Sequence, residues 1–444
     1  MKPAPLKPAP QNARKPRPRK GPSPVRSTKG TSEAKRLQMP HAVINRRAAD
    51  RLRTGFLWVY SSDVESLENI GAEPPALLPV VDGRGLLMGT ALYSPTSQIA
   101  LRLLSSEHLS EPAWLVLLAK RLRAAIAHRR PLLTAETDAC RLCFSEADEL
   151  PGLVIDKYAG LIIVQLLARG LDNAGVRQTC VEVLCEELSP STILERPDPR
   201  IREIEGLSAP SLTPLFAADA NVAETRTIFH LNGLVFDYDG NSGQKTGAFL
   251  DQRLNYQAAA DWATQLGATG RALDVCTYQG GFALHLARVC QQVTGVDASR
   301  SSLEVAEQNL AANASQLSAK VDWIAADAFD LLRGWAQAGE KFDVIVIDPP
   351  AFAKSKRAVE GALRGYKELN LRALHMLRGG GLLVTCSCSH HVSWAELEAA
   401  VAAAASDAHR RVRLLERRGA AVDHPVVLNL PETEYLKCLI CQVD

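Results

Sequence analysis

The sequence predicts an α/β protein with a mostly parallel sheet in its carboxyl-terminal half, preceded by a small β-barrel and an α+β middle domain. From residue 271 onward, apolar strands alternate with helical stretches, which is typical of βαβ units and a parallel sheet. Short β segments fill residues 41–104, as in a small barrel. The last strand, residues 434–442, has no helix after it, and we expect it to enter the sheet antiparallel.

Length and composition indicate a globular protein with several domains. The chain has 444 residues, of which 46% are hydrophobic and 23% charged, enough for two or three domains. No apolar run approaches the ~20 residues of a membrane span, and the amino terminus lacks the apolar stretch of a signal peptide. Ten cysteines without a secretion signal favour free thiols in a reducing, cytoplasmic compartment.

Residues 1–39 are strongly basic and rich in proline. They contain eleven Lys or Arg, eight prolines and one acid, Glu33, so this tail carries +10 and the rest of the chain −8. Because the tail has almost nothing to bury, we expect it to be disordered. A basic arm of this kind suits nucleic acid through contacts with phosphates. A solvated terminus without a partner is the alternative.

The middle of the chain is predicted to mix helices and strands. Helical periodicity covers residues 111–128, and two strands, 153–156 and 161–167, precede a helix at 171–187. Another strand pair is expected at 230–239. The resulting division is a basic tail (1–39), a barrel (40–107), an α+β middle domain (108–228) and an α/β domain (229–444).

A glycine turn follows the first strand of the α/β domain, residues 271–276. Gly280 and Gly281 would let the backbone approach a ligand, and the helix that starts at Phe282 would offer unpaired N–H groups. Tyr278 lies inside the turn. The spacing differs from the G-x-G-x-x-G fingerprint of dinucleotide sites, so another nucleotide-type cofactor is indicated.

Acidic residues follow three successive strands of this domain. Asp274 could accept hydrogen bonds from an ammonium group, Asp297 (followed by Ala298) from ribose hydroxyls, and Asp327 from an adenine amino group. A helix cap or a solvated carboxylate is the alternative for each one taken alone. Taken together, the three acids are the pattern of an S-adenosylmethionine site.

Asp348 and two prolines follow the fourth strand. Pro349 and Pro350 would stiffen the loop, so that the carboxylate and a backbone carbonyl can face a flat substrate beside the cofactor. A rigid exit from the strand is the alternative. Enzymes that methylate amino groups usually have Tyr or Phe after the two prolines. This chain has Ala351 at that position, which argues against methylation of an amino group.

Two cysteines, Cys386 and Cys388, stand at the end of the fifth strand. They share strand parity, so both project to one side of the sheet at its ligand edge. A thiolate that attacks C6 of a pyrimidine makes C5 nucleophilic enough to take a methyl group, after which a base must remove the C5 proton. The alternative is a small core residue, which we favour for Cys386 but not for Cys388.

No metal site is predicted, although two C-x-x-C pairs occur, Cys140/Cys143 and Cys438/Cys441. The second pair flanks two apolar residues of a strand, where i and i+3 face opposite sides and cannot share a zinc ion. The histidine pair that starts at His390 is expected to be solvated.

Residues 40–444 resemble the bacterial large-subunit (23S) rRNA cytosine-C5 methyltransferases, which join an amino-terminal PUA domain to a Rossmann-like methyltransferase domain. Besides the stretches above, the resemblance rests on residues 89–95, 99–102, 150–156 and 245–253. It implies S-adenosylmethionine as cofactor and RNA, specifically large-subunit rRNA, as partner. It implies no membrane association and leaves a homodimer open.

The resemblance also implies roles for single residues. In this family the nucleophilic cysteine follows a Gly-Gly turn as x-x-x-Thr-x-Ser-Cys-Ser, which places it on Cys388. Asp348 would orient the cytosine and protonate its N3 side. The 245–253 element would add Gln252 to the cofactor contacts, and Lys245 and Arg253 to the substrate contacts.

The chain departs from related enzymes at two positions. Ala351 stands where many RNA C5 methyltransferases carry a second cysteine for product release, and Ala248 where this family has an aromatic residue. These departures concern product release and the fine contacts with the substrate. Two other functions also stay open. One is an RNA methyltransferase acting on guanine N2 or adenine N6, which needs no thiol. The other is a non-catalytic RNA-binding factor in ribosome assembly.

Overall fold

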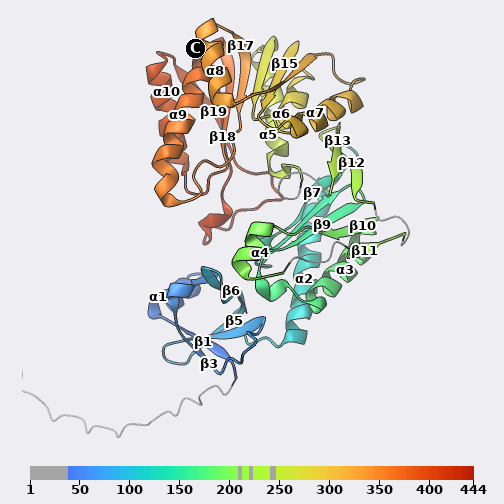
Figure 1. Ribbon diagram of the computed structural model, residues 1–444, viewed down its shortest axis with the longest axis vertical. Coiled ribbons are helices and arrows are strands. Elements are labelled where there is room, and N and C mark those ends of the chain that lie inside the picture. Colours follow the sequence, from blue (N-terminus) through green and yellow to red (C-terminus); the bar gives the residue numbers. More distant parts are fainter. Residues whose placement is uncertain (1–38, 209–212, 220–223, 241–246) are drawn as a thin grey trace, which may run out of the picture. The chain divides into compact units, whose positions relative to one another are not determined.

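The computed structural model describes residues 39–208, 213–219, 224–240 and 247–444 (Figure 1). The expected basic tail, apart from its last residue, and Lys245 lie outside the described residues. In the part of the chain that is described, no helix has the length and apolar character needed to cross a membrane.

The amino-terminal part is a six-stranded sheet. Its strands are β1 (His41–Ile44), β2 (Trp58–Tyr60), β3 (Val64–Glu68), β4 (Leu77–Asp82), β5 (Leu87–Tyr93) and β6 (Ile99–Ser105), in the order β2-β6-β5-β4-β1-β3. The edge strands β2 and β3 are joined by the three-residue turn η1 (Ser61–Asp63), so the sheet has to curl back on itself, as in the predicted barrel. Helix α1 (Arg46–Arg53), which we did not expect, packs Leu52 into the core of this sheet.

A five-stranded sheet follows, in the order β11-β10-β9-β8-β7. Its elements are β7 (Ala139–Phe144), β8 (Leu153–Tyr158), β9 (Leu161–Leu166), β10 (Thr192–Glu195) and β11 (Phe216–Ala217), with helices α2 (Glu111–Arg129), α3 (Ala174–Leu188) and α4 (Pro199–Glu205). The predicted helix at 111–128 is confirmed as α2. Helix α3 begins later than expected because the Asn173 side chain accepts a hydrogen bond from the backbone N–H of Val176 and caps it.

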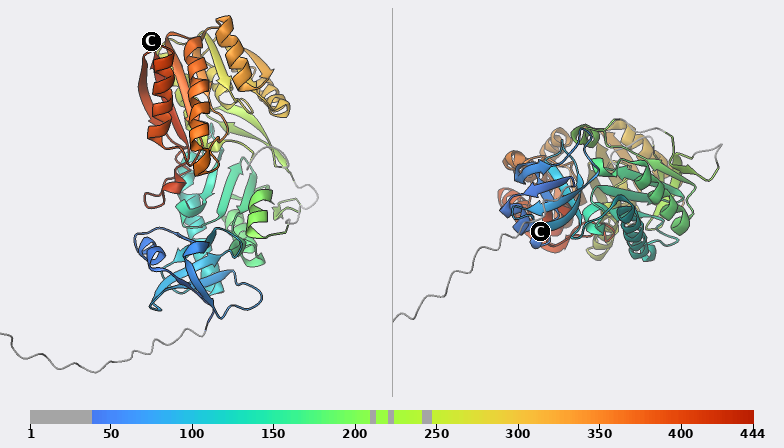
Figure 2. Two further views of the ribbon diagram at one scale, coloured as in Figure 1. Left: turned by 60° about the vertical axis from the view of Figure 1, so that its left-hand side comes forward. Right: turned by 90° about the horizontal axis from the view of Figure 1, so that it is seen from below.

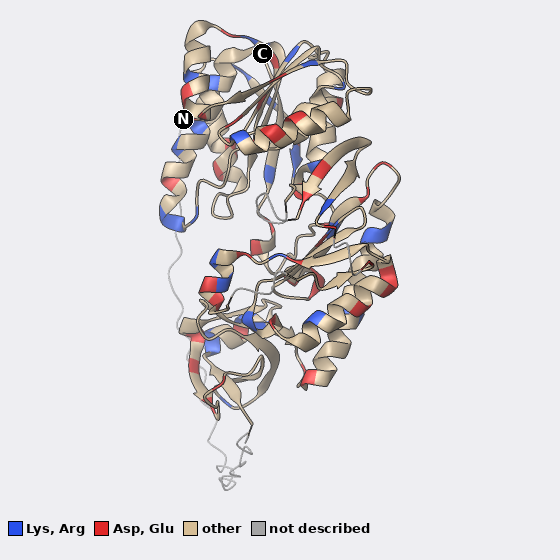
Figure 3. Ribbon diagram, turned by 45° about the vertical axis from the view of Figure 1, so that its right-hand side comes forward, with Lys and Arg blue, Asp and Glu red and all other residues tan. Residues whose placement is uncertain are grey.

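Charged residues of both signs are interspersed along α2 and α3 (Figure 3). Arg123 of α2 pairs with Glu186 of α3, and Arg130, in the turn directly after α2, pairs with Glu187 of α3. These pairs are solvent-exposed and contribute little to stability.

The hairpin of β12 (Arg226–Leu231) and β13 (Leu234–Asp239) connects the middle sheet to the carboxyl-terminal sheet. Tyr238 of this hairpin stacks on Tyr158 of β8, with ring centroids 3.9 Å apart. The same apolar cluster includes Leu284 of the carboxyl-terminal domain. A continuous core therefore joins these two sheets.

The carboxyl-terminal sheet has seven strands in the order β16-β15-β14-β17-β18-β20-β19. They are β14 (Arg271–Val275), β15 (Gln292–Asp297), β16 (Lys320–Ala325), β17 (Phe342–Ile347), β18 (Leu377–Ser387), β19 (Val412–Arg418) and β20 (Lys437–Val443). The five predicted parallel strands are present, and the last strand inserts antiparallel between β18 and β19, as predicted. Strand β19 was not expected.

Helices cover both faces of this sheet (Figures 1 and 2). On one face lie α5 (Arg253–Gln265), α6 (Gly281–Leu286) and α7 (Arg300–Ala312), and on the other α8 (Ala328–Ala338), α9 (Val359–Met376) and α10 (Trp394–Asp407). Alternate residues of β17 serve the two layers, since Val344 and Val346 pack with α5 and α6, and Ile345 with α9. The helices after β14 and β17 leave on opposite faces, which opens a crevice at the carboxyl ends of these neighbouring strands.

Candidate functional site

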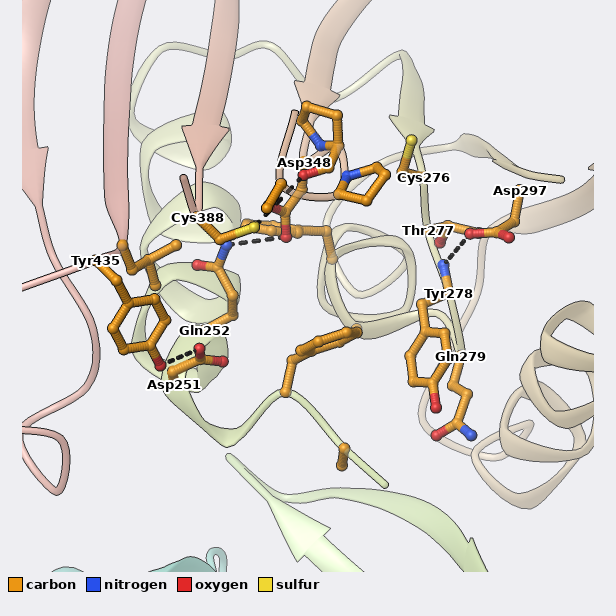
Figure 4. Close-up of a pocket in the computed structure, with 18 of the residues that line it drawn as sticks. Asp251, Gln252, Cys276, Thr277, Tyr278, Gln279, Asp297, Asp348, Cys388 and Tyr435 are labelled. Atoms are coloured by element: carbon orange, nitrogen blue, oxygen red, sulfur yellow. Dashed lines mark hydrogen bonds between the residues drawn. The ribbon is translucent and has the colours of Figure 1, made fainter. Parts of the chain in front are cut away.

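A cavity of about 990 Å³ opens at this crevice (Figure 4). That volume suits a nucleotide-sized ligand together with a substrate group. Most of the predicted site residues line it, namely Gln252, Tyr278, Gly281, Phe282, Asp297, Ala298, Asp327, Asp348, Pro349, Pro350 and Cys388. Figure 4 shows Cys388, Asp348 and Tyr435 on one side of the cavity, and Tyr278 and Asp297 on the other.

The glycine turn after β14 is built around Asp274. This carboxylate is fully buried, does not line the cavity, and accepts hydrogen bonds from the Thr277 hydroxyl (2.5 Å) and the Ala283 N–H (2.9 Å). Gly280 has φ +89°, a conformation that favours glycine. A Cβ on Gly281 would lie 2.4 Å from the ring of Tyr256, so the missing side chain makes room for protein packing. Asp274 therefore stabilises the turn from the protein interior and does not face a ligand.

The buried position of Asp274 has a consequence for stability. Burial raises its pKa to about 7 against the opposing effect of its two hydrogen bonds, and Oδ1 has no hydrogen-bond partner among the described residues. Because the folded-state pKa lies above the ordinary 3.8, the folded chain holds this proton more tightly than the unfolded chain. The resulting stabilisation is complete below about pH 4 and is lost as the pH rises through about 7.

Replacing Asp274 with Asn should remove this pH dependence. Relative to the wild-type chain, the free energy of unfolding of Asp274→Asn should rise by roughly 1–3 kcal/mol between about pH 5 and pH 8, because the amide cannot ionise. Chemical denaturation at both pH values measures the difference, and other titrating groups cancel between the two chains. Parallel pH profiles would show that the carboxyl is ionised in the folded chain at pH 5.

Asp297 ends β15 and faces the cavity. Its Oδ2 accepts the N–H of Tyr278 at 2.9 Å (Figure 4), and its Oδ1 accepts the N–H of Ser299 at 2.8 Å. Two backbone groups therefore fix the carboxylate at the strand end. Each oxygen retains a lone pair for a further donor. This arrangement suits a ligand with neighbouring hydroxyl groups.

Asp327 follows β16 and combines two features that the sequence leaves as alternatives, a helix cap and a place at the ligand cavity. Its Oδ1 accepts the N–H groups of Phe329 (2.9 Å) and Asp330 (3.1 Å) and thereby caps helix α8. The residue also lines the cavity beside Phe329. The cap therefore holds the carboxylate at the cavity wall.

The two cysteines of the β18 end have different surroundings. Cys386 is fully buried opposite Cys438 of β20, and burial raises the pKa of its thiol far above the ordinary value. Cys388 comes after the last residue of the strand and lines the cavity, and its thiol donates a hydrogen bond to the Pro349 carbonyl at 3.9 Å. Of the pair, Cys388 is the thiol that a ligand in the cavity can reach.

Asp348 lies beside Cys388 and is oriented by Gln252. The Gln252 side-chain N–H donates to Asp348 Oδ2 at 2.9 Å (Figure 4), and the Gln252 side-chain carbonyl accepts from Asn255 at 2.6 Å. Gln252 is 2% exposed, so its conformation is fixed by these partners. We expected Gln252 as a cofactor contact, and the structure places it on the Asp348 side of the cavity.

Arg253 is buried away from the cavity, contrary to the prediction from sequence. The sequence predicts Arg253 as a substrate contact, but the residue is 2% exposed and does not line the cavity. Its guanidinium forms a buried ion pair with Asp423, whose carboxylate also accepts the N–H of Arg141 at 2.8 Å. Arg253 therefore ties α5 to the segment after β19 and to the middle sheet. Lys245, the other predicted substrate contact, lies outside the described residues.

Several aromatic residues of the cavity were not foreseen. Phe249, Phe329 and Tyr435 line it, and the Tyr435 hydroxyl donates to Asp251 at 2.5 Å. His390, expected to be solvated, also lines the cavity, and its ring lies 5.4 Å from that of Tyr435. Tyr435 lies two residues before the start of β20 and far along the chain from Asp251, so no local spacing signalled the contact.

The cysteine pairs form no metal centre in the described residues. Cys140 and Cys143 lie in β7, whereas Cys438 and Cys441 lie in β20. No group of three or more His, Cys, Asp or Glu in the described ranges is arranged to hold a metal ion.

Comparison with known proteins identifies two domains by sequence. Residues 42–106 match the PUA-like domain family, and residues 217–427 match the S-adenosylmethionine-dependent methyltransferase family. The second match confirms the cofactor predicted from the acids that follow three strands of the sheet. The two matches also agree with a barrel ahead of an α/β domain.

Curated relatives align along nearly the whole chain. The ribosomal RNA large subunit methyltransferase I of Salmonella arizonae is 35% identical over 410 residues, covering 91% of this chain and 98% of the relative. The protein of the same name from Photobacterium profundum is 35% identical, covering 88% of this chain and 96% of the relative. The crystal structure of SMU.776, described as a methyltransferase complexed with SAH, has a TM-score of 0.75 at 19% identity, covering 91% of this chain and 100% of that one. This last likeness confirms the predicted fold class.

Proposed function

This chain belongs to the family of ribosomal RNA large subunit methyltransferases I, and we propose that it methylates C5 of a cytosine in large-subunit ribosomal RNA. The observation that carries the proposal is the thiol of Cys388 beside the carboxylate of Asp348 in one cavity. Transfer to C5 needs a nucleophile and a proton donor at such positions, whereas transfer to an exocyclic amine needs no thiol.

The carboxylates at the ends of β15 and β16 fit S-adenosylmethionine. Asp297, fixed by two backbone N–H groups, would accept the ribose hydroxyls, and Asp327 would accept the adenine amino group beside Phe329. The side of the cavity that holds Asp297 is separate from the side that holds Cys388, so both ligands can be present together (Figure 4). When bound, this cofactor supplies an electrophilic methyl group.

Cys388 and Asp348 have different roles in the reaction of the cytosine, as nucleophile and proton donor. The Cys388 thiolate forms a bond to C6, and the π electrons of C5=C6 shift toward C5 and N3 as Asp348, in its protonated form, gives a proton to N3. C5 is then nucleophilic and accepts the methyl group. Removal of the C5 proton by a base restores the double bond, breaks the C6–S bond, and returns Cys388 as a thiolate. The N3 proton returns to Asp348.

RNA has to deliver a single base to this cavity. A paired cytosine would be flipped out at a cost of about a few kcal/mol, or presented in a single strand. We assign the RNA affinity that offsets this cost to the PUA-like domain at residues 42–106 and to the basic tail.

Bisulfite mapping of large-subunit rRNA from cells with and without this gene tests the proposed function. One cytosine should resist conversion only when the gene is present, and restoring the gene should restore its protection. If no cytosine changes, the chain does not methylate C5 in this RNA. A new N2-methylguanine or N6-methyladenine would identify an amino-methylating enzyme, and no modified base at all would identify a binding factor.

Loss of the Asp297 carboxylate should weaken cofactor binding. If both ribose hydroxyls donate to it, Asp297→Ala should reduce the affinity for S-adenosylmethionine by roughly 1.5–3 kcal/mol, the usual contribution of hydrogen bonds to a charged group. Titration calorimetry measures the change. Asp322→Ala on neighbouring β16, whose side chain does not line the cavity, is the matched control and should bind normally. Unchanged affinity in folded Asp297→Ala would place the ribose elsewhere.

A further inference from the structure

Lys437 reaches the end of β18 from the neighbouring antiparallel strand. It is the first residue of β20 and pairs with Ser387 in the register of the sheet. Its ammonium donates a hydrogen bond to the backbone carbonyl of Ser389 at 2.9 Å. Cys388 is the residue between these two contacts, so the ammonium lies against the segment that carries the cavity thiol.

This ammonium is buried and has no carboxylate in contact. Lys437 is 3% exposed, and among the described residues no ion pair within 4.0 Å involves it. Burial lowers the pKa of Lys437, while the charges of Glu434, Cys388 and Glu396 act to raise it. A buried cation without an anionic partner is costly, and the cost falls when an anion forms nearby.

The other groups around Cys388 do not supply a fixed positive charge. Asp348, at the end of β17, opposes a thiolate when it is ionised. Tyr366 of α9 hydrogen-bonds to the hydroxyls of Ser387 (2.8 Å) and Ser389 (3.1 Å), and burial raises its pKa, so it stays neutral. His390 lines the open cavity. Among these groups around Cys388, Lys437 is the one that is both buried and cationic.

We infer that Lys437 is a positioning residue that favours the thiolate form of Cys388 and holds its segment toward the cavity. The inference rests on the proposed function, because it assigns to Lys437 the activation of the proposed nucleophile. Cys388 ionises before RNA binds, its proton passes to water through the cavity, and Lys437 keeps its own proton throughout. The hydrogen bond to the Ser389 carbonyl fixes the backbone next to the thiol.

The pH dependence of alkylation at Cys388 tests this inference without RNA or turnover. The full chain is treated with iodoacetamide across a pH series, and the Cys388 peptide is quantified by mass spectrometry, which separates it from the other nine cysteines. In the wild-type chain the thiol pKa should lie below the ordinary value of about 8.5. Lys437→Met should raise it by about one unit or more, and alkylation near pH 7 should slow roughly tenfold.

Two further variants separate charge from structure. Lys437→Arg keeps the charge and should retain an alkylation rate within about threefold of the wild-type chain. Lys157→Met removes a half-buried lysine of β8 in the middle sheet and should leave Cys388 unchanged. Binding of S-adenosylhomocysteine checks that each variant is folded, and Lys437→Gln replaces Lys437→Met if the latter does not fold.

An equal Cys388 pKa in the wild-type chain and in folded Lys437→Met or Lys437→Gln would overturn the inference. A wild-type pKa at or above the ordinary value would overturn it as well, even if no variant folds. Failure of the proposed function is a different result, since rRNA would then lack the methylated cytosine whatever the alkylation profile shows.

Discussion

Replacing Cys388 with alanine is expected to abolish methyl transfer to RNA. Without the thiolate no bond forms at C6, and C5 of cytosine remains too poor a nucleophile to accept the methyl group. The rate should fall by at least roughly 10³-fold, as is usual when a covalent nucleophile is removed. Incorporation of labelled methyl groups into rRNA that lacks the modification measures this loss. Binding of S-adenosylmethionine should persist, because Asp297 and Tyr278 lie on the other side of the cavity.

Cys386→Ala is the matched control for this variant. Cys386 is on the same strand but fully buried against Cys438, so removing its sulfur should cost some stability and leave most of the activity. The reverse ranking, with an active Cys388→Ala and an inactive Cys386→Ala, would show that Cys388 is not the nucleophile.

The second large effect is expected at Asp348. Asp348→Asn keeps the size of the side chain but cannot give a proton to N3 of the base. The single-turnover rate should therefore fall by roughly 10²–10⁴-fold, the range for a general acid. Rapid quenching at saturating RNA and cofactor isolates the chemical step from binding.

A carboxylate at the opposite end of the same strand provides the control. Asp343 of β17 accepts the Arg271 N–H and pairs with Arg378, away from the cavity. Asp343→Asn should leave the single-turnover rate unchanged. If Asp348→Asn were as fast as Asp343→Asn, proton transfer to the base would have to come from another group.

The sequence predicts the parts of this protein that depend on local pattern. Strands β14 to β18 are apolar runs separated by helical stretches, and the positions of Asp297, Asp348 and Cys388 at strand ends follow directly from that alternation. Parallel strands bring their carboxyl ends to one edge, so residues far apart in the chain could be assigned to one site. The antiparallel insertion of β20 was predicted from its position as the last strand.

Other features depend on contacts that no local pattern reveals. Strand β19 carries four charged residues in Val412–Arg418, and its strand character comes from pairing with β20. Arg253 belongs to a motif that suggests RNA contact, yet its partner Asp423 comes 170 residues later and draws it into the core. Asp274 has the sequence position of a ligand contact, but its carboxylate is buried and accepts hydrogen bonds from Thr277 and Ala283. Each of these outcomes is set by tertiary packing.

Trapping the enzyme on RNA tests the central claim most directly. In RNA that carries 5-fluorocytosine, attack by Cys388 and methyl transfer can proceed, but no base can remove fluorine from C5, so the C6–S bond persists. The wild-type chain should form a covalent complex, stable on a denaturing gel, that requires S-adenosylmethionine, and its digest should carry the nucleotide on the Cys388 peptide. The complex should be absent with Cys388→Ala. No covalent complex with the wild-type chain on RNA that it methylates, or a complex that survives in Cys388→Ala, would contradict the account.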